Sequence, residues 1–264
     1  MLTDSNGWLR IAEVNPPELP DMRHRSLYPA WSHVLVTDNV FGKIRLSPYA
    51  FSARITHDVP ELQPTVVVST RDRNILAIES EVRGALMNGV DSFLVVIGDT
   101  VPHVDHLAHH YEIVEHLRTL QEDLPRFEVG MPARFREWQF RRRIDLGAQF
   151  FVVGPVLDPE SVEPNLARLG LRPEDPPVFL MVIPPFGLDW VDRMEAMGSV
   201  PVGPRLKERL EGLEPVVMRK TAWEMTSEIE QRARDAGCAG VILMGLKFDS
   251  VVDEAPEAWV SSGS

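Results

Sequence analysis

The chain has 264 residues, a formal net charge of −12 at pH 7 and a hydrophobic fraction of 44%. This length suffices for one large domain or two small ones, and the composition is typical of a globular protein with a substantial core. No apolar stretch approaches the roughly 18 residues that cross a bilayer, so we expect no membrane-spanning segment. The acidic balance argues against a nucleic-acid partner, because such binding depends on lysine and arginine neutralising phosphates. We therefore expect a small-molecule partner.

The cysteine content and the first residues indicate a cellular compartment. Cys238 is the single cysteine of the sequence, so it cannot form an intramolecular disulfide. The first ten residues lack the basic region and the long apolar run of a secretory signal. Both observations favour a reducing, cytoplasmic location, and they leave the oligomeric state open.

Eight short apolar runs alternate with helical patterns along the chain. The predicted strands are residues 8–15, 33–38, 65–70, 92–99, 126–131, 150–156, 177–184 and 239–246. Most of these runs are continuously apolar, which is typical of strands buried on both faces of a parallel sheet. The predicted helices are residues 47–57, 73–89, 104–122, 137–147, 159–169, 187–197 and 222–236, with Gly89 and Gly237 as stop signals. Eight such units in this length favour a (β/α)₈ TIM barrel over an open sheet.

The first strand-to-strand connection is the irregular part of this pattern. Residues 16–32 contain four prolines and no amphipathic period, which predicts a shortened helix or a loop. No low-complexity linker or charge run divides the chain, so residues 1–264 are predicted to form a single catalytic domain. The acidic and then Ser/Gly-rich tail, from about residue 254, is expected to be frayed.

The active site of a TIM barrel lies at the carboxyl ends of its strands, so polar residues there are the candidates. Glu13 lies near the end of the first predicted strand, between apolar neighbours and shortly before Pro16 and Pro17. Partial desolvation would raise the pKa of this carboxyl and let it donate a proton near neutral pH. The alternative is a barrel-lining acid that is paired with a basic neighbour.

Asp99 follows Gly98 at the end of the fourth predicted strand. Glycine would let a ligand approach the backbone closely, and a carboxylate can accept two N–H bonds from a flat heterocycle. The alternative is an N-cap, because aspartate is favoured there and a helix is predicted to follow. The other residues at predicted strand ends are Thr37, Asp38, Asn39, Ser69, Thr70, Arg71, Asp72, Arg134, Gly154, Pro155, Phe186 and Lys247.

Two conspicuous clusters give weaker signals. His103, His106 and His110 have helical spacing, but they lack the interposed glutamate of the zinc-protease motif, and we predict no metal site. The basic cluster of residues 134–143 spans several helical faces, so most of it is expected to be solvated surface, with Arg134 alone near a strand end.

Several stretches together resemble the methylenetetrahydrofolate reductase family. They are "AEVNPPEL", "VLVTDN", "STRDRNILAIESEVRGALMNGVDSFLVVIGD" and "RRRIDLGAQFFVVGPVLDPES", in the family's order and spacing and at low identity. The resemblance covers most of the chain and implies a (β/α)₈ barrel that reduces 5,10-methylenetetrahydrofolate to 5-methyltetrahydrofolate, usually through bound FAD.

The resemblance also implies residue roles. Glu13 would be the acid that helps open the five-membered ring to an iminium, and Asp99 would bind the pterin. Together with the strand-end positions, this leads us to assign further binding residues. The substrate-binding candidates are Asp99, Thr37, Asp38, Gly154 and Phe186, and the cofactor-binding candidates are Ser69, Thr70, Arg71 and Arg134.

Three positions depart from the family pattern. The family's flavin-contacting histidine and arginine align with Val67 and Ile97, and its folate-binding glutamine aligns with Gly154. Short flavin-independent members are similar in length and in such losses. We therefore expect direct hydride transfer from NADH or NADPH without FAD. The alternatives are an FAD-dependent reductase and a non-catalytic folate-binding barrel.

Overall fold

Eight parallel strands close into a barrel in sequence order, with β8 pairing with β1. The strands are β1 (Leu9–Val14), β2 (His33–Val36), β3 (Gln63–Ser69), β4 (Ser92–Val96), β5 (Glu128–Ala133), β6 (Phe150–Val156), β7 (Val178–Val182) and β8 (Gly240–Leu243). This computed structural model describes residues 1–5, 7–18, 31–99, 109–196, 200 and 202–245. The predicted (β/α)₈ TIM barrel and each of its eight strands are confirmed.

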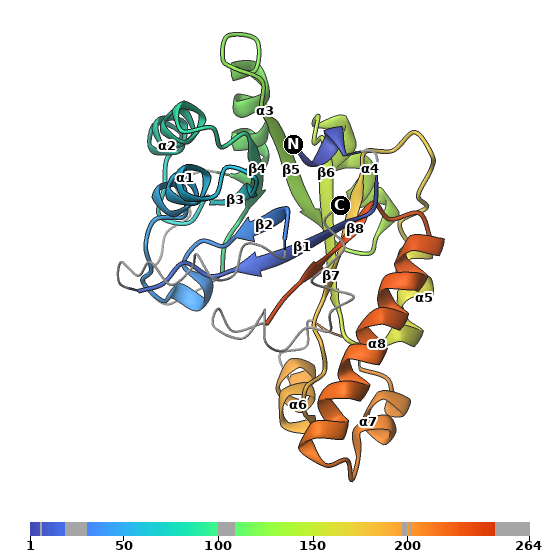
Figure 1. The fold of residues 1–264 in the computed structure, drawn as a ribbon. Coiled ribbons are helices and arrows are strands. Elements are labelled where there is room, and N and C mark those ends of the chain that lie inside the picture. Colours follow the sequence, from blue (N-terminus) through green and yellow to red (C-terminus); the bar gives the residue numbers. More distant parts are fainter. Residues whose placement is uncertain (6, 19–30, 100–108, 197–199, 201, 246–264) are drawn as a thin grey trace.

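Helices cover the outside of the barrel. They are α1 (Pro48–Asp58), α2 (Ile75–Met87), α3 (His110–Leu120), α4 (Glu137–Asp145), α5 (Val162–Ala167), α6 (Leu188–Ala196), α7 (Pro204–Leu210) and α8 (Pro215–Asp235), with 3₁₀ turns η1 (Leu2–Asp4), η4 (Val40–Gly42) and η5 (Pro159–Ser161). In Figure 1, α1 and α2 lie on one side of the strands and α5 and α8 on the opposite side. Among the described residues, no helix is long and apolar enough to span a membrane.

The helix predictions are confirmed in position, with differences at the boundaries. The short helix α7 was not predicted, and α8 begins at Pro215 rather than at residue 222. Gly237 follows α8 with a φ of 88°, as its stop signal predicts. The predicted first crossover and the acidic tail lie outside the described residues, except for positions 16–18, 31 and 32.

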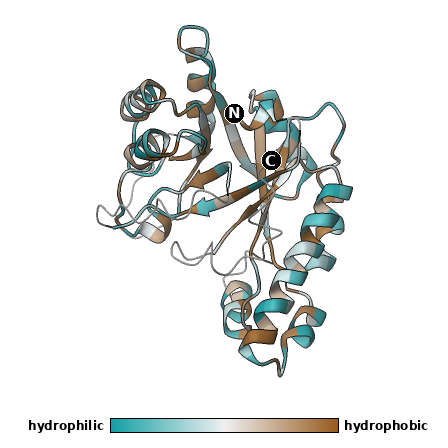
Figure 2. Ribbon diagram, in the orientation of Figure 1, coloured by the Kyte–Doolittle hydropathy of each residue, from teal (hydrophilic) through white to brown (hydrophobic). Residues whose placement is uncertain are grey.

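Two apolar layers account for the continuous runs in the strands. The barrel interior is filled by Leu2, Ile11, Leu35, Val67, Leu94, Phe150, Val152, Phe179 and Ile242. The alternate strand residues face outward and pack against the helices. Figure 2 shows hydrophobic residues gathered mainly on the strands and hydrophilic residues on the outward helix faces. A strand whose two faces are both buried needs apolar residues at nearly every position.

The amino-terminal end of the barrel is closed by the first residues of the chain. Buried Glu128 at the start of β5 accepts hydrogen bonds from the N–H groups of Leu2 (2.6 Å) and Thr3 (3.0 Å) and from the hydroxyl of Ser92 (2.7 Å). Leu2 is thereby held in the interior layer. The amino-terminal end of the barrel is therefore closed by these contacts. The polar candidates for a site lie at the carboxyl ends of the strands.

Candidate active site

Glu13 lies near the carboxyl end of β1 and points to the barrel interior. It is two residues after Ile11 and pairs in register with Leu35 of β2, and both of these side chains belong to the interior layer. Side chains alternate along a strand, so Ala12 and Val14 face the helices instead. Glu13 is therefore the polar residue that continues the interior layer of β1 towards its open end.

Burial changes the proton affinity of Glu13. Desolvation, and secondly the negative charge of Asp99, raise the pKa of its carboxyl from 4.5 to about 7. Within the described part of the chain, no basic side chain forms an ion pair or hydrogen bond with it, which does not support the alternative of a paired barrel-lining acid. A carboxyl with this pKa is partly protonated near neutral pH and can act as a general acid.

The raised pKa makes the free energy of unfolding depend on pH. The folded pKa of Glu13, about 7, lies above its unfolded value, so the favourable contribution of the protonated form is lost as the pH rises towards 7. Glu13→Gln is neutral at every pH. Relative to this variant, the wild type should lose about 3 kcal/mol of its free energy of unfolding between about pH 4 and pH 7. Urea unfolding of both proteins across this range measures the difference, and a pH-independent difference would contradict the raised pKa.

Asp99, at the end of the β4 segment, holds the loop that follows β2. Its Oδ2 atom accepts a hydrogen bond from the N–H of Phe41 at 2.5 Å, and its carbonyl accepts one from Arg71 at 3.0 Å. The described helix that follows begins at His110 and has His109 as its N-cap, and residues 100–108 lie outside the described residues, so the N-cap alternative for Asp99 stays untested. The negative charge of Asp99 contributes to the raised pKa of Glu13, so the two predicted functional acids influence one another electrostatically.

Gly98 lies directly beside the end of β3. A Cβ atom at this position would lie 2.2 Å from the Oγ atom of Ser69. The space beside Gly98 is thus taken by the end of β3, and the missing side chain lets β3 and β4 end close together. Close approach of a ligand is not needed to explain this glycine.

Arg71 joins the ends of β2, β3 and β4. Its side chain is 5% exposed, and it donates hydrogen bonds to the carbonyls of Asp99 (3.0 Å) and Asn39 (2.9 Å). Its nearest described acid is Asp72, at 3.9 Å. Arg71 was predicted to bind the cofactor, and in the structure its guanidinium fixes the loops around Asp99.

The remaining candidates on β2 and β3 are largely engaged within the protein. The hydroxyl of Thr37 donates to the side chain of Asn15 (2.7 Å), and the carboxylate of Asp38 forms an ion pair with Arg73. Ser69 and Thr70 are buried. The Thr70 N–H donates to the carbonyl of Val96 at 3.0 Å. These side chains shape the rim of the site, and the direct contacts predicted for them stay predictions.

The candidates on β5 to β7 occupy other parts of the rim. Arg134 is exposed at the end of β5. Phe186 packs edge-on against Trp223 of α8, with ring centroids 5.5 Å apart. Gly154 is exposed with a φ of 107°, and a Cβ atom there would lie 2.9 Å from the carbonyl oxygen of Met181. Only glycine adopts this conformation readily, so a glutamine side chain cannot simply be restored at this position.

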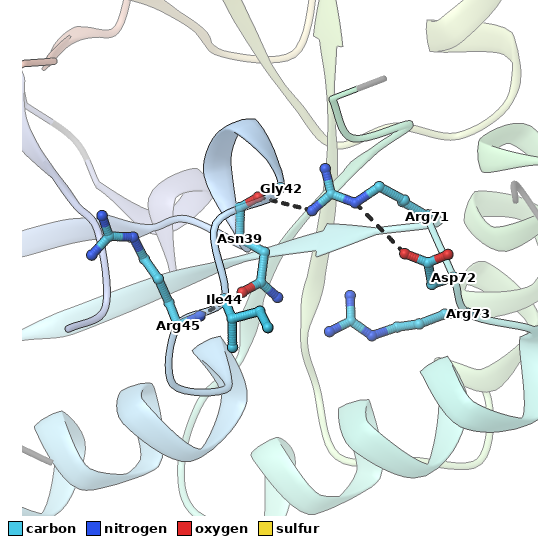
Figure 3. A pocket seen from close by; sticks show the side chains of 7 residues that line it. All are labelled: Asn39, Gly42, Ile44, Arg45, Arg71, Asp72 and Arg73. Atoms are coloured by element: carbon cyan, nitrogen blue, oxygen red, sulfur yellow. Dashed lines mark hydrogen bonds and ion pairs between the residues drawn. The ribbon is translucent and has the colours of Figure 1, made fainter. Parts of the chain in front are cut away.

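A pocket of about 320 Å³ opens between the loops after β2 and β3. It is lined by Asn39, Gly42, Ile44, Arg45, Arg71, Asp72 and Arg73. Figure 3 shows Arg71 and Arg73 extending from one loop towards Asn39 and Ile44 on the other. Arg45, Ile44 and Arg73 were not predicted as site residues, because nothing in a loop sequence indicates which second loop will meet it.

The histidine cluster remains without support as a metal site. His103 and His106 lie outside the described residues, and burial, together with nearby His109 and Arg143, lowers the pKa of His110 to about 4. His110 also lies against Tyr111, with ring centroids 4.2 Å apart. Across the described residues, no three His, Cys, Asp or Glu side chains are grouped so as to hold a metal ion.

No protein-family model matches the chain, and no curated protein matches it. Solved structures do resemble it. An uncharacterized protein from Clostridium thermocellum that binds two copies of 5-methyl-5,6,7,8-tetrahydrofolic acid is 12% identical with a TM-score of 0.66, covering 96% of this chain and 94% of that one.

Two enzymes of known structure are also similar to this chain. Oxaloacetate acetylhydrolase is 10% identical with a TM-score of 0.55, covering 92% of this chain and 77% of that chain. A 2,3-dimethylmalate lyase of the PEP mutase/isocitrate lyase superfamily is 11% identical with a TM-score of 0.55, covering 95% and 78%. At these identities the comparisons establish the shared fold.

Proposed function

We propose that this barrel binds a reduced folate at the carboxyl ends of its strands and reduces 5,10-methylenetetrahydrofolate to 5-methyltetrahydrofolate. The hydride would come directly from NADH or NADPH. The observation that carries the proposal is Glu13, an interior carboxyl whose pKa is raised to about 7 and which has no basic partner among the described residues. Ligand binding alone does not require a buried acid with a raised pKa, whereas proton transfer to a leaving nitrogen does.

The proposed reaction consumes one proton and one hydride. The protonated Glu13 carboxyl donates its proton to N10 as the bond between N10 and the methylene carbon breaks, which leaves an iminium at N5. The hydride of the reduced nicotinamide then adds to the methylene carbon and forms the N5 methyl group. The nicotinamide is oxidised by two electrons, and Glu13 recovers a proton from water before the next cycle.

The rim residues supply the binding contacts in this proposal. Asp99 accepts N–H groups of the pterin, beside Thr37 and Asp38, with Phe186 and the backbone of Gly154 across the barrel mouth. Ser69, Thr70 and Arg71 border the dinucleotide, and the exposed guanidinium of Arg134 is available to its phosphates. The folate bound by the Clostridium thermocellum barrel supports this ligand class.

The two flavin contacts of the resembling family have no polar counterparts here. Val67 packs in the interior layer of the barrel, and Ile97 is an apolar side chain that is 47% exposed. Neither side chain can donate a hydrogen bond or carry charge. These residues do not fit FAD, which supports direct transfer over the flavin-dependent alternative.

One observation favours a second candidate function, a folate-binding barrel without catalysis. Gly154 offers no side chain to the substrate, and its φ of 107° disfavours any. An absorbance scan of the purified protein, followed by NADH and NADPH oxidation with methylenetetrahydrofolate, tests both candidates. Substrate-dependent oxidation supports the reductase, whereas tight folate binding without oxidation would leave the binding protein as the better description.

Asp99→Asn should weaken 5-methyltetrahydrofolate binding about tenfold or more and leave NADH binding within about twofold, because an amide accepts one N–H well where a carboxylate accepts two. It should also lower the pKa of Glu13, since the charge of Asp99 helps to raise it. Isothermal titration and a pH profile measure both effects. Asp145→Asn, at an exposed position in the last turn of α4, is the matched control, and equal losses for both ligands would reject the pterin-anchor role.

A further inference from the structure

Phe41 displays an aromatic ring to solvent next to the predicted pterin anchor. It lies in η4 after β2 and is 60% exposed. Its N–H donates to the Oδ2 atom of Asp99 at 2.5 Å, so the backbone that carries the ring is held by the residue that we propose to bind the heterocycle. No core contact explains the choice of a large aromatic residue here, because Phe41 belongs to none of the apolar layers of the described chain.

The backbone around Phe41 is held in an unfavourable conformation. Phe41 has a φ of 55° and Asn39 a φ of 44°, both in the left-handed region. A bulky residue rarely adopts this region, and such strain persists only where the surroundings impose it, often at binding sites. Two contacts impose it here, the Asp99 bond to the Phe41 N–H and the Arg71 bond to the Asn39 carbonyl.

The two loops that meet at this hydrogen bond carry further exposed apolar side chains. Ile97, two residues before Asp99, is 47% exposed, and Ile44, three residues after Phe41, is 87% exposed. Exposed large apolar side chains beside a few polar groups are typical of ligand sites. The Oδ1 atom of Asp99 receives no hydrogen bond from any described residue, so it is available to an N–H donor of a ligand.

We propose that Phe41 is a stacking platform for the heterocycle whose N–H groups Asp99 accepts. The Oδ2 atom of Asp99 holds the loop that carries the Phe41 ring, while its Oδ1 atom binds the edge of the ligand. One carboxylate therefore positions the hydrogen-bonded edge of the heterocycle and, through the loop, the ring that stacks on its face. The identity of this heterocycle as a reduced pterin rests on the proposed function.

The test compares side chains at position 41 by isothermal titration with 5-methyltetrahydrofolate and with 6-methyltetrahydropterin, which has the ring system and no tail. Phe41→Ala should weaken both ligands about tenfold, whereas Phe41→Tyr should bind both within about twofold of the wild type. Leu76→Ala, which removes an exposed apolar side chain from α2, is the control and should bind like the wild type.

Phe41→Gly separates stacking from folding. Glycine adopts a φ of 55° without strain, so this variant should unfold about 2 °C higher than the wild type while losing affinity as Phe41→Ala does. A purely structural role for Phe41 predicts the reverse, a lower midpoint together with unchanged affinity in the folded protein.

The outcomes separate this inference from the proposed function. Unchanged affinity of Phe41→Ala for both ligands, or an equal loss in Phe41→Tyr, would overturn the stacking role alone. Absence of folate binding by the wild-type protein would overturn the proposed function and the pterin assignment with it. A tenfold loss for folate with no loss for the tail-free pterin would place Phe41 against the tail and would also overturn the inference.

Discussion

Glu13→Gln is expected to lower turnover by about 10²–10⁴-fold while the barrel remains folded. Glutamine has nearly the shape of protonated glutamic acid, so the interior position at the end of β1 can accept it. It cannot release a proton to the leaving nitrogen, and ring opening then depends on water. NADH oxidation with methylenetetrahydrofolate measures the loss. The circular dichroism spectrum should match that of the wild type.

The pH profile provides an internal check on this role. With a Glu13 pKa of about 7, wild-type turnover should fall about tenfold for each pH unit above neutrality, because the acid form is depleted. In Glu13→Gln, this fall of turnover above neutral pH should be absent. Glu61→Gln, a surface change of the same chemistry, is the control. If Glu13→Gln keeps more than about a third of wild-type activity, Glu13 is not the proton donor.

The second large effect concerns flavin. Charge-assisted hydrogen bonds contribute roughly 1.5–3 kcal/mol each, so apolar residues in place of the two family contacts should weaken FAD by about two to four orders of magnitude. We expect a colourless protein whose activity does not rise when FAD is added. NADH and methylenetetrahydrofolate must then be bound together, which gives intersecting lines in a two-substrate kinetic analysis.

An exposed site allows a gain-of-function check on the flavin prediction. Ile97→Arg places a guanidinium at a position that is 47% exposed, where the longer side chain does not disturb the core. FAD affinity should rise about tenfold relative to the wild type, as fluorescence quenching of the flavin would measure. Stoichiometric flavin in the purified wild-type protein, or parallel kinetic lines, would restore the flavin-dependent alternative.

The strands could be predicted because their signal is local. A strand buried between the barrel interior and the helices must be apolar along its length, and each of the eight runs shows this. The start of α8 and the helix α7 lacked such a signal. Val216 and Val217 in the first turn of α8 are 81% and 50% exposed, so the apolar residues there do not mark a buried face.

The candidate site was predictable only in part. Glu13 and Asp99 stand at strand ends, and the parallel arrangement of a barrel brings such ends together. The partners of these acids could not be predicted. The side chain of Arg71 donates hydrogen bonds to three backbone carbonyls, those of Asp38, Asn39 and Asp99. The hydrogen bond from the Phe41 N–H to Asp99 joins residues that are 58 positions apart.

The sequence by itself determined the strand order, the fold class and the position of an acid at the end of the first strand. These follow from apolar periodicity and from the identity of single residues, which act through near neighbours. Only the tertiary structure decided that burial and the charge of Asp99 raise the pKa of Glu13, that Gly154 cannot carry a side chain easily, and that a strained loop exposes Phe41. Desolvation, loop-to-loop hydrogen bonds and backbone strain depend on segments that meet only when the barrel closes.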